Sequence, residues 1–162
     1  MKALVVTVSD RVSRGEAEDR SGPAAAAALG ALGFAAEIRV IPDGVDTVRT
    51  ALRDAVQSGV GLVITTGGTG FAPRDLTPEG TSAVVDRPAP GLVEAMRAAT
   101  FGVNPHGMLS RGVAGIAGRT LIDNLPGSDT GDEESLAVIA PALRHAIDLL
   151  QGSDGNHDPS GD

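Results

Sequence analysis

Residues 62–79 read LVITTGGTGFAPRDLTPE, and this stretch decides how the rest of the chain is interpreted. Its first residues belong to an apolar run of strand length, Gly61–Thr66, which stops at the glycine-rich turn Gly67–Gly70. The pair Arg74-Asp75 follows, and then Thr77-Pro78-Glu79, which is typical of a helix start with threonine as the cap. A strand, an anion-sized loop, a charge pair and a helix in this order predict a site for a phosphorylated ligand.

Apolar runs of strand length alternate with helical patterns along the whole chain. The predicted strands are Ala3–Val8, Ala35–Ile41, Gly61–Thr66, Val113–Ala117 and Thr120–Leu125. The predicted helices run from Pro23 to Leu32, from Val45 to a stop at Gly59, from Thr77 onward, from Leu92 to Thr100, and along an apolar stripe from Leu136 to Leu150. This alternation is typical of an α/β fold with a mostly parallel sheet.

The last helix carries two features that affect its ends and its course. Pro141 lies inside the apolar stripe, so we expect a kink or break near Ala140. Asp129 is a candidate for the cap of this helix. Residues 1–152 are expected to form one domain, and the polar, glycine-rich residues 153–162 are expected to be a disordered tail.

Composition excludes several functional classes. The chain of 162 residues contains no cysteine, which excludes disulfides, thiolate chemistry and cysteine-ligated metals. Its net charge of −8 makes it a poor general binder of nucleic acid. No apolar run approaches the roughly 20 residues that span a bilayer. We therefore expect a cytosolic protein that binds neither nucleic acid nor membranes.

Ligands of open parallel sheets bind beyond the carboxyl ends of the strands. The connectivity places four loops there, and each contains glycine, proline or serine together with a charged residue. These loops are Ser9–Arg14, Pro42–Gly44, Gly67–Asp75 and Leu125–Asp129. We expect them to share one rim and to build the binding site together.

The glycine loop is suited to phosphate, because successive backbone N–H groups can point into one concavity where no side chain intervenes. It is neither a Walker A loop nor the Rossmann fingerprint, since the required spacings are absent. A tight turn without a ligand remains the alternative.

A carboxylate beside a phosphate cradle needs a compensating cation. Asp75 is therefore a candidate ligand of Mg²⁺, which proteins hold through one or two carboxylates plus substrate phosphates and water. Asp43, at the end of the neighbouring strand, is the candidate second carboxylate. The alternatives are surface ion pairs for Arg74-Asp75 and a simple turn role for Asp43. No Ser/His/Asp pattern supports a nucleophile, so positioning and charge neutralisation favour phosphoryl or nucleotidyl transfer.

These motifs resemble those of a known family, the molybdenum cofactor biosynthesis proteins of the MogA/MoaB type, with the related G domains of gephyrin and its plant counterpart. The resemblance covers about residues 3–151. It rests on Thr66–Gly70 followed by Arg74–Glu79, Ser9-Asp10-Arg11, Ile41-Pro42-Asp43, Leu109-Ser110-Arg111 with Ala114-Gly115, Leu125-Pro126-Gly127, and Glu134.

The resemblance implies a three-layer α/β/α fold, a homotrimer and transient contact with other molybdenum cofactor biosynthesis proteins. It also implies an adenylyltransferase in which the terminal phosphate of molybdopterin attacks the α-phosphate of ATP and pyrophosphate leaves. Asp75 and Asp43 then serve as catalytic and Mg²⁺-binding carboxylates. The implied substrate- and phosphate-binding residues are Gly67, Gly68, Thr69, Gly70, Ser9, Asp10, Arg11, Ser110, Arg111, Pro126 and Gly127.

One segment departs from the family pattern. A proline that usually follows the Leu-Pro-Gly turn is replaced, and the sequence continues Ser128 to Glu134 with acidic residues. A non-catalytic molybdopterin-binding or assembly protein on the same fold is therefore the second hypothesis. The residues alone, without the resemblance, leave a third, a nucleotide-binding domain for another phosphorylated substrate.

Overall fold

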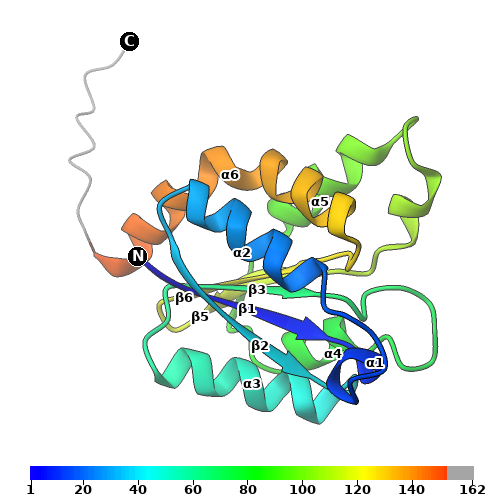
Figure 1. The fold of residues 1–162 in the computed structure, drawn as a ribbon. Coiled ribbons are helices and arrows are strands. Elements are labelled where there is room, and N and C mark those ends of the chain that lie inside the picture. The colour runs from blue at the N-terminus through cyan, green and yellow to red at the C-terminus, as the bar shows by residue number, and fades with distance from the viewer. Residues whose placement is uncertain (153–162) are drawn as a thin grey trace.

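The computed structural model describes residues 1–152, and the predicted tail at 153–162 lies outside the described residues. A six-stranded sheet lies between two layers of helices (Figure 1). The strands are β1 (Lys2–Val8), β2 (Ala35–Ile41), β3 (Leu62–Thr66), β4 (Arg87–Pro88), β5 (Ala114–Ala117) and β6 (Thr120–Leu125). The helices are α1 (Asp10–Ser13), α2 (Ser21–Ala31), α3 (Val45–Gln57), α4 (Thr77–Ser82), α5 (Pro90–Thr100), α6 (Asp129–Gln151) and the 3₁₀ helix η1 (Pro105–Leu109).

The sheet has the strand order β2-β1-β3-β6-β5-β4. The strands β2, β1, β3 and β6 are mutually parallel, whereas β5 and β4 are antiparallel to their neighbours. The predicted mostly parallel α/β/α architecture is confirmed. Because Thr66 of β3 pairs with Thr7 of β1 and with Leu125 of β6, the carboxyl ends of these strands are level, and their loops leave from one edge.

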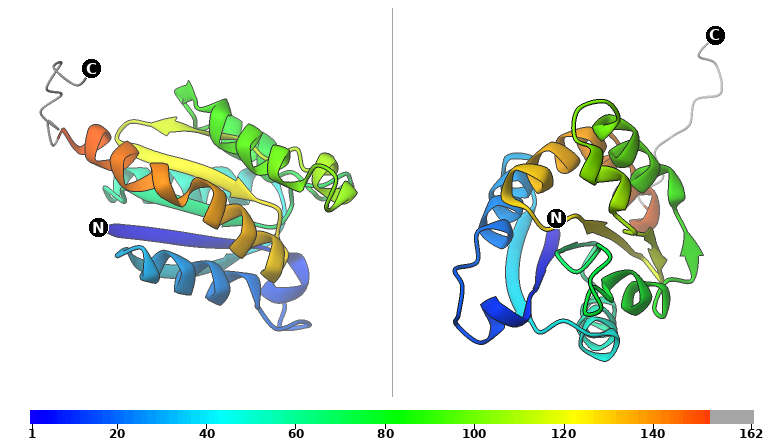
Figure 2. Two further views of the ribbon diagram at one scale, coloured as in Figure 1. Left: turned by 90° about the horizontal axis from the view of Figure 1, so that it is seen from above. Right: turned by 90° about the vertical axis from the view of Figure 1, so that its right-hand side faces the viewer.

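Each face of the sheet carries its own hydrophobic core. One face is covered by α2, α5 and α6, with α6 between the other two (Figure 2). The opposite face packs against α3 and α4, which lie together below the sheet in Figure 1. All five residues of β3 are buried, as expected for a central strand covered on both faces. No helix in the described part of the chain is long and apolar enough to cross a membrane.

Of the kink or break predicted near Ala140, the break is wrong. Helix α6 is continuous over 23 residues and contains Pro141 in its interior. An interior proline costs about 3 kcal/mol through the lost hydrogen bond and steric clash. Burial of one large aliphatic side chain contributes about 1.5–3 kcal/mol. Four side chains of the apolar stripe are at most 2% exposed, so the packing of α6 outweighs the proline: Leu136, Ile139, Leu143 and Ile147.

The caps of two helices also differ from prediction. Helix α6 is capped by Ser128, whose hydroxyl accepts the N–H of Gly131 at 3.1 Å, and Asp129 is the first helical residue. Helix α4 has Leu76 at its N-cap and no side-chain cap, so Thr77 is not the cap. The hydroxyl of Thr77 donates instead to the carbonyl of Gly67. Helix α1, strand β4 and η1 were not predicted, because each is too short to show the periodicity of a helix or of a strand.

One buried charge stands apart from the apolar core. Asp123 lies in β6, opposite Ile64 of β3 and Ala114 of β5, and is 0% exposed. Neither carboxyl oxygen has a hydrogen-bond partner within the described part of the chain. Burial raises the pKa of Asp123 to about 8. The carboxyl is therefore protonated and neutral at pH values below that range.

Replacement of this carboxyl tests its effect on stability. An aspartate in the unfolded chain titrates near pH 4, so the folded state holds its proton longer and loses stability as pH rises from about 4 to about 8. Asp123→Asn removes this titration. We expect the stability of the variant relative to the original chain to rise by about 4 kcal/mol between about pH 5 and about pH 9. Urea unfolding at both pH values measures it, and a difference independent of pH contradicts the burial argument.

Candidate functional site

A hollow of about 360 Å³ opens at the carboxyl ends of the parallel strands. Its lining includes residues from all four predicted rim loops, namely Ser9, Asp43, Gly67, Gly68, Asp75, Pro126 and Gly127. A second hollow of about 510 Å³ lies on the other side of the glycine loop and includes Thr69, Gly70, Ser110 and Pro126. The predicted common rim is confirmed, and the glycine loop forms the wall between the two hollows.

The glycine loop is shaped by backbone contacts that exclude side chains. Gly67 and Gly68 have positive φ angles of 95° and 65°. A Cβ atom on Gly67 would lie 2.5 Å from the carbonyl oxygen of Val8, and one on Gly68 would lie 2.4 Å from the hydroxyl of Thr77. Thr77 donates from its hydroxyl to the Gly67 carbonyl at 2.9 Å and from its N–H to the Gly68 carbonyl at 3.0 Å. The start of α4 therefore fixes the loop.

The N–H groups of this loop remain available. Among the described residues, none accepts a hydrogen bond from the backbone N–H of Gly67, Gly68, Thr69 or Gly70. Consecutive unpaired N–H groups beside a hollow form the concavity that binds anions. Thr69 is buried, and because buried backbone donors without partners are rare, its unpaired N–H favours a ligand over an empty turn.

The turn after β6 meets the glycine loop backbone to backbone. A Cβ atom on Gly127 would lie 2.4 Å from the Cα of Gly67. Asp132, fully buried near the start of α6, holds the two together, because it accepts hydrogen bonds from the Thr66 hydroxyl and from the Gly127 N–H, the latter at 2.9 Å. Sequence reasoning missed Asp132, since an acidic residue in the first turn of a helix normally indicates a dipole contact.

The two predicted metal ligands line the same hollow. The Oδ2 atom of Asp43 accepts the Asp10 N–H at 2.7 Å, and Oδ2 of Asp75 accepts the Ala72 N–H at 2.9 Å. Within the described residues, Oδ1 of each carboxylate has no hydrogen bond. No cluster of three or more acidic or histidine residues suited to a metal occurs in residues 1–152. The pair fits Mg²⁺ only if substrate phosphates and water supply the remaining ligands, which is the usual mode for this ion.

Asp19 is a further acidic residue of the first hollow that sequence reasoning missed. Its carboxylate accepts the Thr7 hydroxyl at 2.8 Å and the Gly22 N–H at 2.9 Å. The spacing to Gly22 at the start of α2 is that of an ordinary helix cap, so the sequence carried no sign of a site. The first hollow is consequently acidic, with Glu18, Asp19, Asp43 and Asp75 against Arg20.

Three predicted site residues line neither hollow. Arg11 is exposed. Asp10 is bound by Arg74, whose hydrogen bonds hold the pKa of the Asp10 carboxyl below its ordinary value. Arg111 donates to the Gly70 carbonyl at 2.8 Å, to the Asp75 carbonyl and to Glu79. Asp10 and Arg111 thus support the rim from outside the hollows, and contact of these three residues with substrate stays a prediction.

Comparison with known proteins agrees with this geometry. The family model described as a probable molybdopterin binding domain matches residues 4–145. The chain belongs to this family. It is 39% identical over 155 residues to a molybdopterin adenylyltransferase of Helicobacter pylori strain J99, a match covering 92% of this chain and 87% of the relative. It is 40% identical over 157 residues to gephyrin of Dictyostelium discoideum, covering 90% of this chain but 22% of gephyrin.

Solved structures of this family share the fold. The chain superposes on the molybdopterin biosynthesis enzyme MoaB of Thermus thermophilus with a TM-score of 0.87 and 45% identity, covering 93% of this chain and 96% of that one. The span matched by the molybdopterin-binding family begins in β1 and ends in α6, so it includes all four rim loops.

The contact between the two glycine turns is testable by a matched pair of substitutions. Gly127→Ala introduces both a strained φ of 92° and a clash with Gly67, whereas Gly59→Ala introduces a comparable φ of 71° with nothing within 4 Å. We expect Gly59→Ala to cost about 1–2 kcal/mol of unfolding free energy. Gly127→Ala should cost at least about 2 kcal/mol more, because backbone must move. Urea unfolding measures both, and equal losses contradict the close approach.

Proposed function

We propose that this protein is a molybdopterin adenylyltransferase, which transfers AMP from ATP to the terminal phosphate of molybdopterin and releases pyrophosphate. The observation that carries the proposal is the row of unpaired N–H groups at Gly67–Gly70 between two hollows at one rim. Relatives named molybdopterin adenylyltransferase, 39% and 41% identical over most of the chain, support the choice of reaction.

The reaction requires no covalent intermediate with the protein. An anionic oxygen of the molybdopterin phosphate forms a bond to the α-phosphorus of ATP, and the bond from that phosphorus to the bridging oxygen breaks. The electron pair leaves with pyrophosphate. Catalysis of this kind depends on position and on charge neutralisation. The N–H groups of segment 67–70 bind phosphate oxygens, and the rigid contact with Gly127 keeps them in place.

Asp43 and Asp75 would hold Mg²⁺, which supplies neutralisation of the phosphate charge when it is bound. Both aspartates line a hollow with an excess of acidic groups, so an unaccompanied triphosphate would be repelled there. The second hollow has an apolar wall that includes Phe71, Met96 and Val103, which suits the ring system of a substrate. Two hollows on either side of one phosphate loop match a reaction that joins two phosphorylated substrates.

Removal of one carboxylate charge tests the catalytic assignment. Asp75→Asn keeps the size of the side chain but weakens its hold on a divalent cation. We expect at least about a 100-fold loss of pyrophosphate release with ATP and molybdopterin, with an unchanged melting temperature. Asp54→Asn, on the exposed surface of α3, is the matched control and should keep full activity. A fully active Asp75→Asn variant contradicts the assigned role.

The non-catalytic alternative has a distinct outcome in the same assay. An assembly protein of this family would bind molybdopterin but release no pyrophosphate in the unmodified chain. Turnover of about 1 s⁻¹ or faster, the low end of ordinary enzymes, excludes it.

The proposal includes a homotrimer, which the resemblance implies. Large apolar side chains are exposed along the segment joining α5 to η1 and within η1, with Phe101 77%, Val103 82% and Met108 58% exposed. An apolar group of this kind on the surface marks an interaction site. The cytosolic location stays a prediction.

A single charge in this segment tests self-association. We expect Val103→Asp to shift the mass measured by light scattering from that of a trimer to that of a monomer, since burial of an unpaired charge is costly. Leu149→Asp, which changes an exposed leucine of α6 outside this segment, should leave the trimer intact. A monomeric unmodified chain contradicts the proposed trimer directly.

A further inference from the structure

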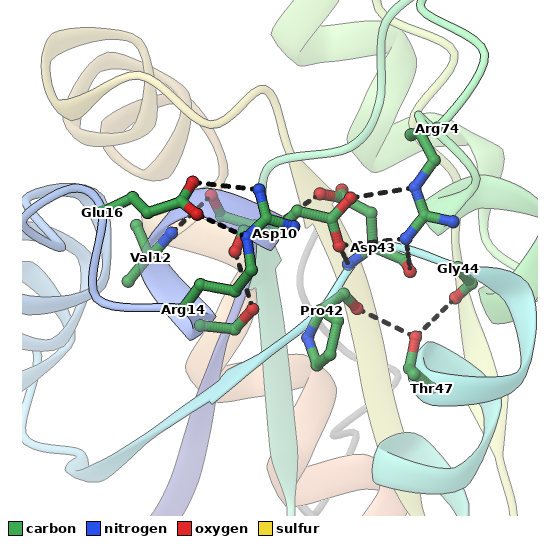
Figure 3. A network of polar contacts seen from close by, with 11 residues as sticks. Asp10, Val12, Arg14, Glu16, Pro42, Asp43, Gly44, Thr47 and Arg74 are labelled. Atoms are coloured by element: carbon green, nitrogen blue, oxygen red, sulfur yellow. Dashed lines mark hydrogen bonds and ion pairs between the residues drawn. The ribbon is translucent and has the colours of Figure 1, made fainter.

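Arg74 joins the loops that carry the two candidate metal ligands (Figure 3). Its Nε and Nη2 atoms each donate to the carboxylate of Asp10 at 2.9 Å, in a two-point fork. The same Nη2 donates to the backbone carbonyl of Asp43 at 2.7 Å. One guanidinium therefore binds two turns of the rim, while its own backbone is next to Asp75 in the chain.

Asp10 and Asp43 are joined by two reciprocal hydrogen bonds. The Asp10 N–H donates to Oδ2 of Asp43 at 2.7 Å, and the Asp43 N–H donates to Oδ1 of Asp10 at 3.1 Å. This reciprocal pair fixes the direction of the Asp43 carboxylate and leaves its Oδ1 unused. The oxygen that receives the Asp43 N–H also receives a bond from Arg74, so the guanidinium and the Asp43 backbone converge on one carboxylate.

Arg74 has no substitute in this role. Among the described residues, every hydrogen bond that joins segment 67–75 to the turns at 9–14 and 42–44 is donated by Arg74. Thr77 and Arg111 also hold segment 67–75 in place, but within residues 1–152 neither hydrogen-bonds to the turns that carry Asp10 and Asp43. Without the fork, the distance between the carboxylates of Asp43 and Asp75 is set by loops whose like charges repel.

We propose that Arg74 and Asp10 are positioning residues, which fix the separation of the Asp43 and Asp75 carboxylates and so set the affinity of the site for a divalent cation with nucleotide. This rests on the proposed function in that it takes these two aspartates as the cation ligands. A cation shared by two carboxylates requires both oxygens at fixed distances, and Mg²⁺ tolerates little deviation from its octahedral geometry.

Charge and position predict opposite results when Arg74 is neutralised. A positive guanidinium near the site repels a cation, so its removal by Coulomb's law alone strengthens cation binding. The positioning role predicts the reverse. Arg74→Met and Arg74→Lys should both weaken binding, because methionine loses the charge and the fork, and lysine keeps the charge but cannot make a two-point contact with fixed geometry.

The experiment is a titration with Mn²⁺ in the presence of a non-hydrolysable ATP analogue, with free Mn²⁺ measured by electron paramagnetic resonance. We expect about a 10-fold weaker Mn²⁺ affinity in both Arg74 variants, equal to about 1.4 kcal/mol. Asp10→Asn should give a similar loss, and the double variant Asp10→Asn with Arg74→Lys should lose little more than either alone. Arg14→Lys is the matched control.

The control substitution removes an equivalent two-point contact that does not connect separate segments of the rim. Arg14 makes a two-point contact with Glu16 at 2.8 and 3.0 Å in the same region, within one segment and exposed. Unchanged or tighter Mn²⁺ binding in the Arg74 variants overturns the proposal, as does an equal loss in Arg14→Lys. Activity is a separate readout, in which excess Mg²⁺ should restore kcat. An unmodified chain that binds Mn²⁺ with nucleotide but forms no adenylylated product refutes the proposed function and leaves this test intact.

Discussion

The close approach of Gly67 and Gly127 is the constraint on which the site depends. Two turns that follow adjacent parallel strands meet with backbone against backbone, so a methyl group on Gly127 would collide with Gly67. Among the described residues, the N–H groups of segment 67–70 have no hydrogen-bond acceptor. Asp132 and Thr77 bind the flanks of the loop, through a Gly127 N–H and through loop carbonyls. The N–H groups of segment 67–70 are consequently left for a ligand.

The site places unpaired backbone amides beside an excess of carboxylates. Binding of an anion and binding of a cation would therefore favour each other there. The unpaired amides suit an anion, but the lining of the first hollow has more carboxylates than guanidinium groups. Arg74 and Arg111, the basic residues nearest the loop in sequence or by contact, are directed to protein carbonyls and carboxylates. Neither of these two guanidinium groups is therefore available to bind a triphosphate. Under the proposed function, a divalent ion brought with the nucleotide would offset this excess of negative charge.

The sequence predicted the parts of the structure that depend on local pattern. The strands end within a residue or so of their predicted bounds, and the rim follows from the parallel connectivity alone. The errors at Pro141 and Thr77 share one physical origin, since in each case a tertiary contact overrides a local rule. Packing keeps α6 continuous across Pro141, and Thr77 is bound to the glycine loop rather than to its own helix. Asp132 and Asp19 look like helix-start residues until the strands bring their partners beside them.

Asp123 shows the limit of pattern in another way. Asp123 lies at a core-facing position of β6, where the alternation of a strand predicts an apolar residue. The structure instead has a neutral, fully buried acid at this position. A core that contains an unpaired carboxyl loses free energy that a valine would not lose. By contrast, both polar atoms of the neighbouring Asn124 side chain, on the opposite face, have hydrogen-bond partners. Its amide nitrogen donates to the hydroxyls of Thr65 and Thr81, and its oxygen accepts the N–H of Val113. Burial alone therefore does not distinguish the two polar residues. The presence of hydrogen-bond partners distinguishes them. The partners of Asn124 belong to β3, α4 and the segment before β5, and only the fold brings these elements beside β6.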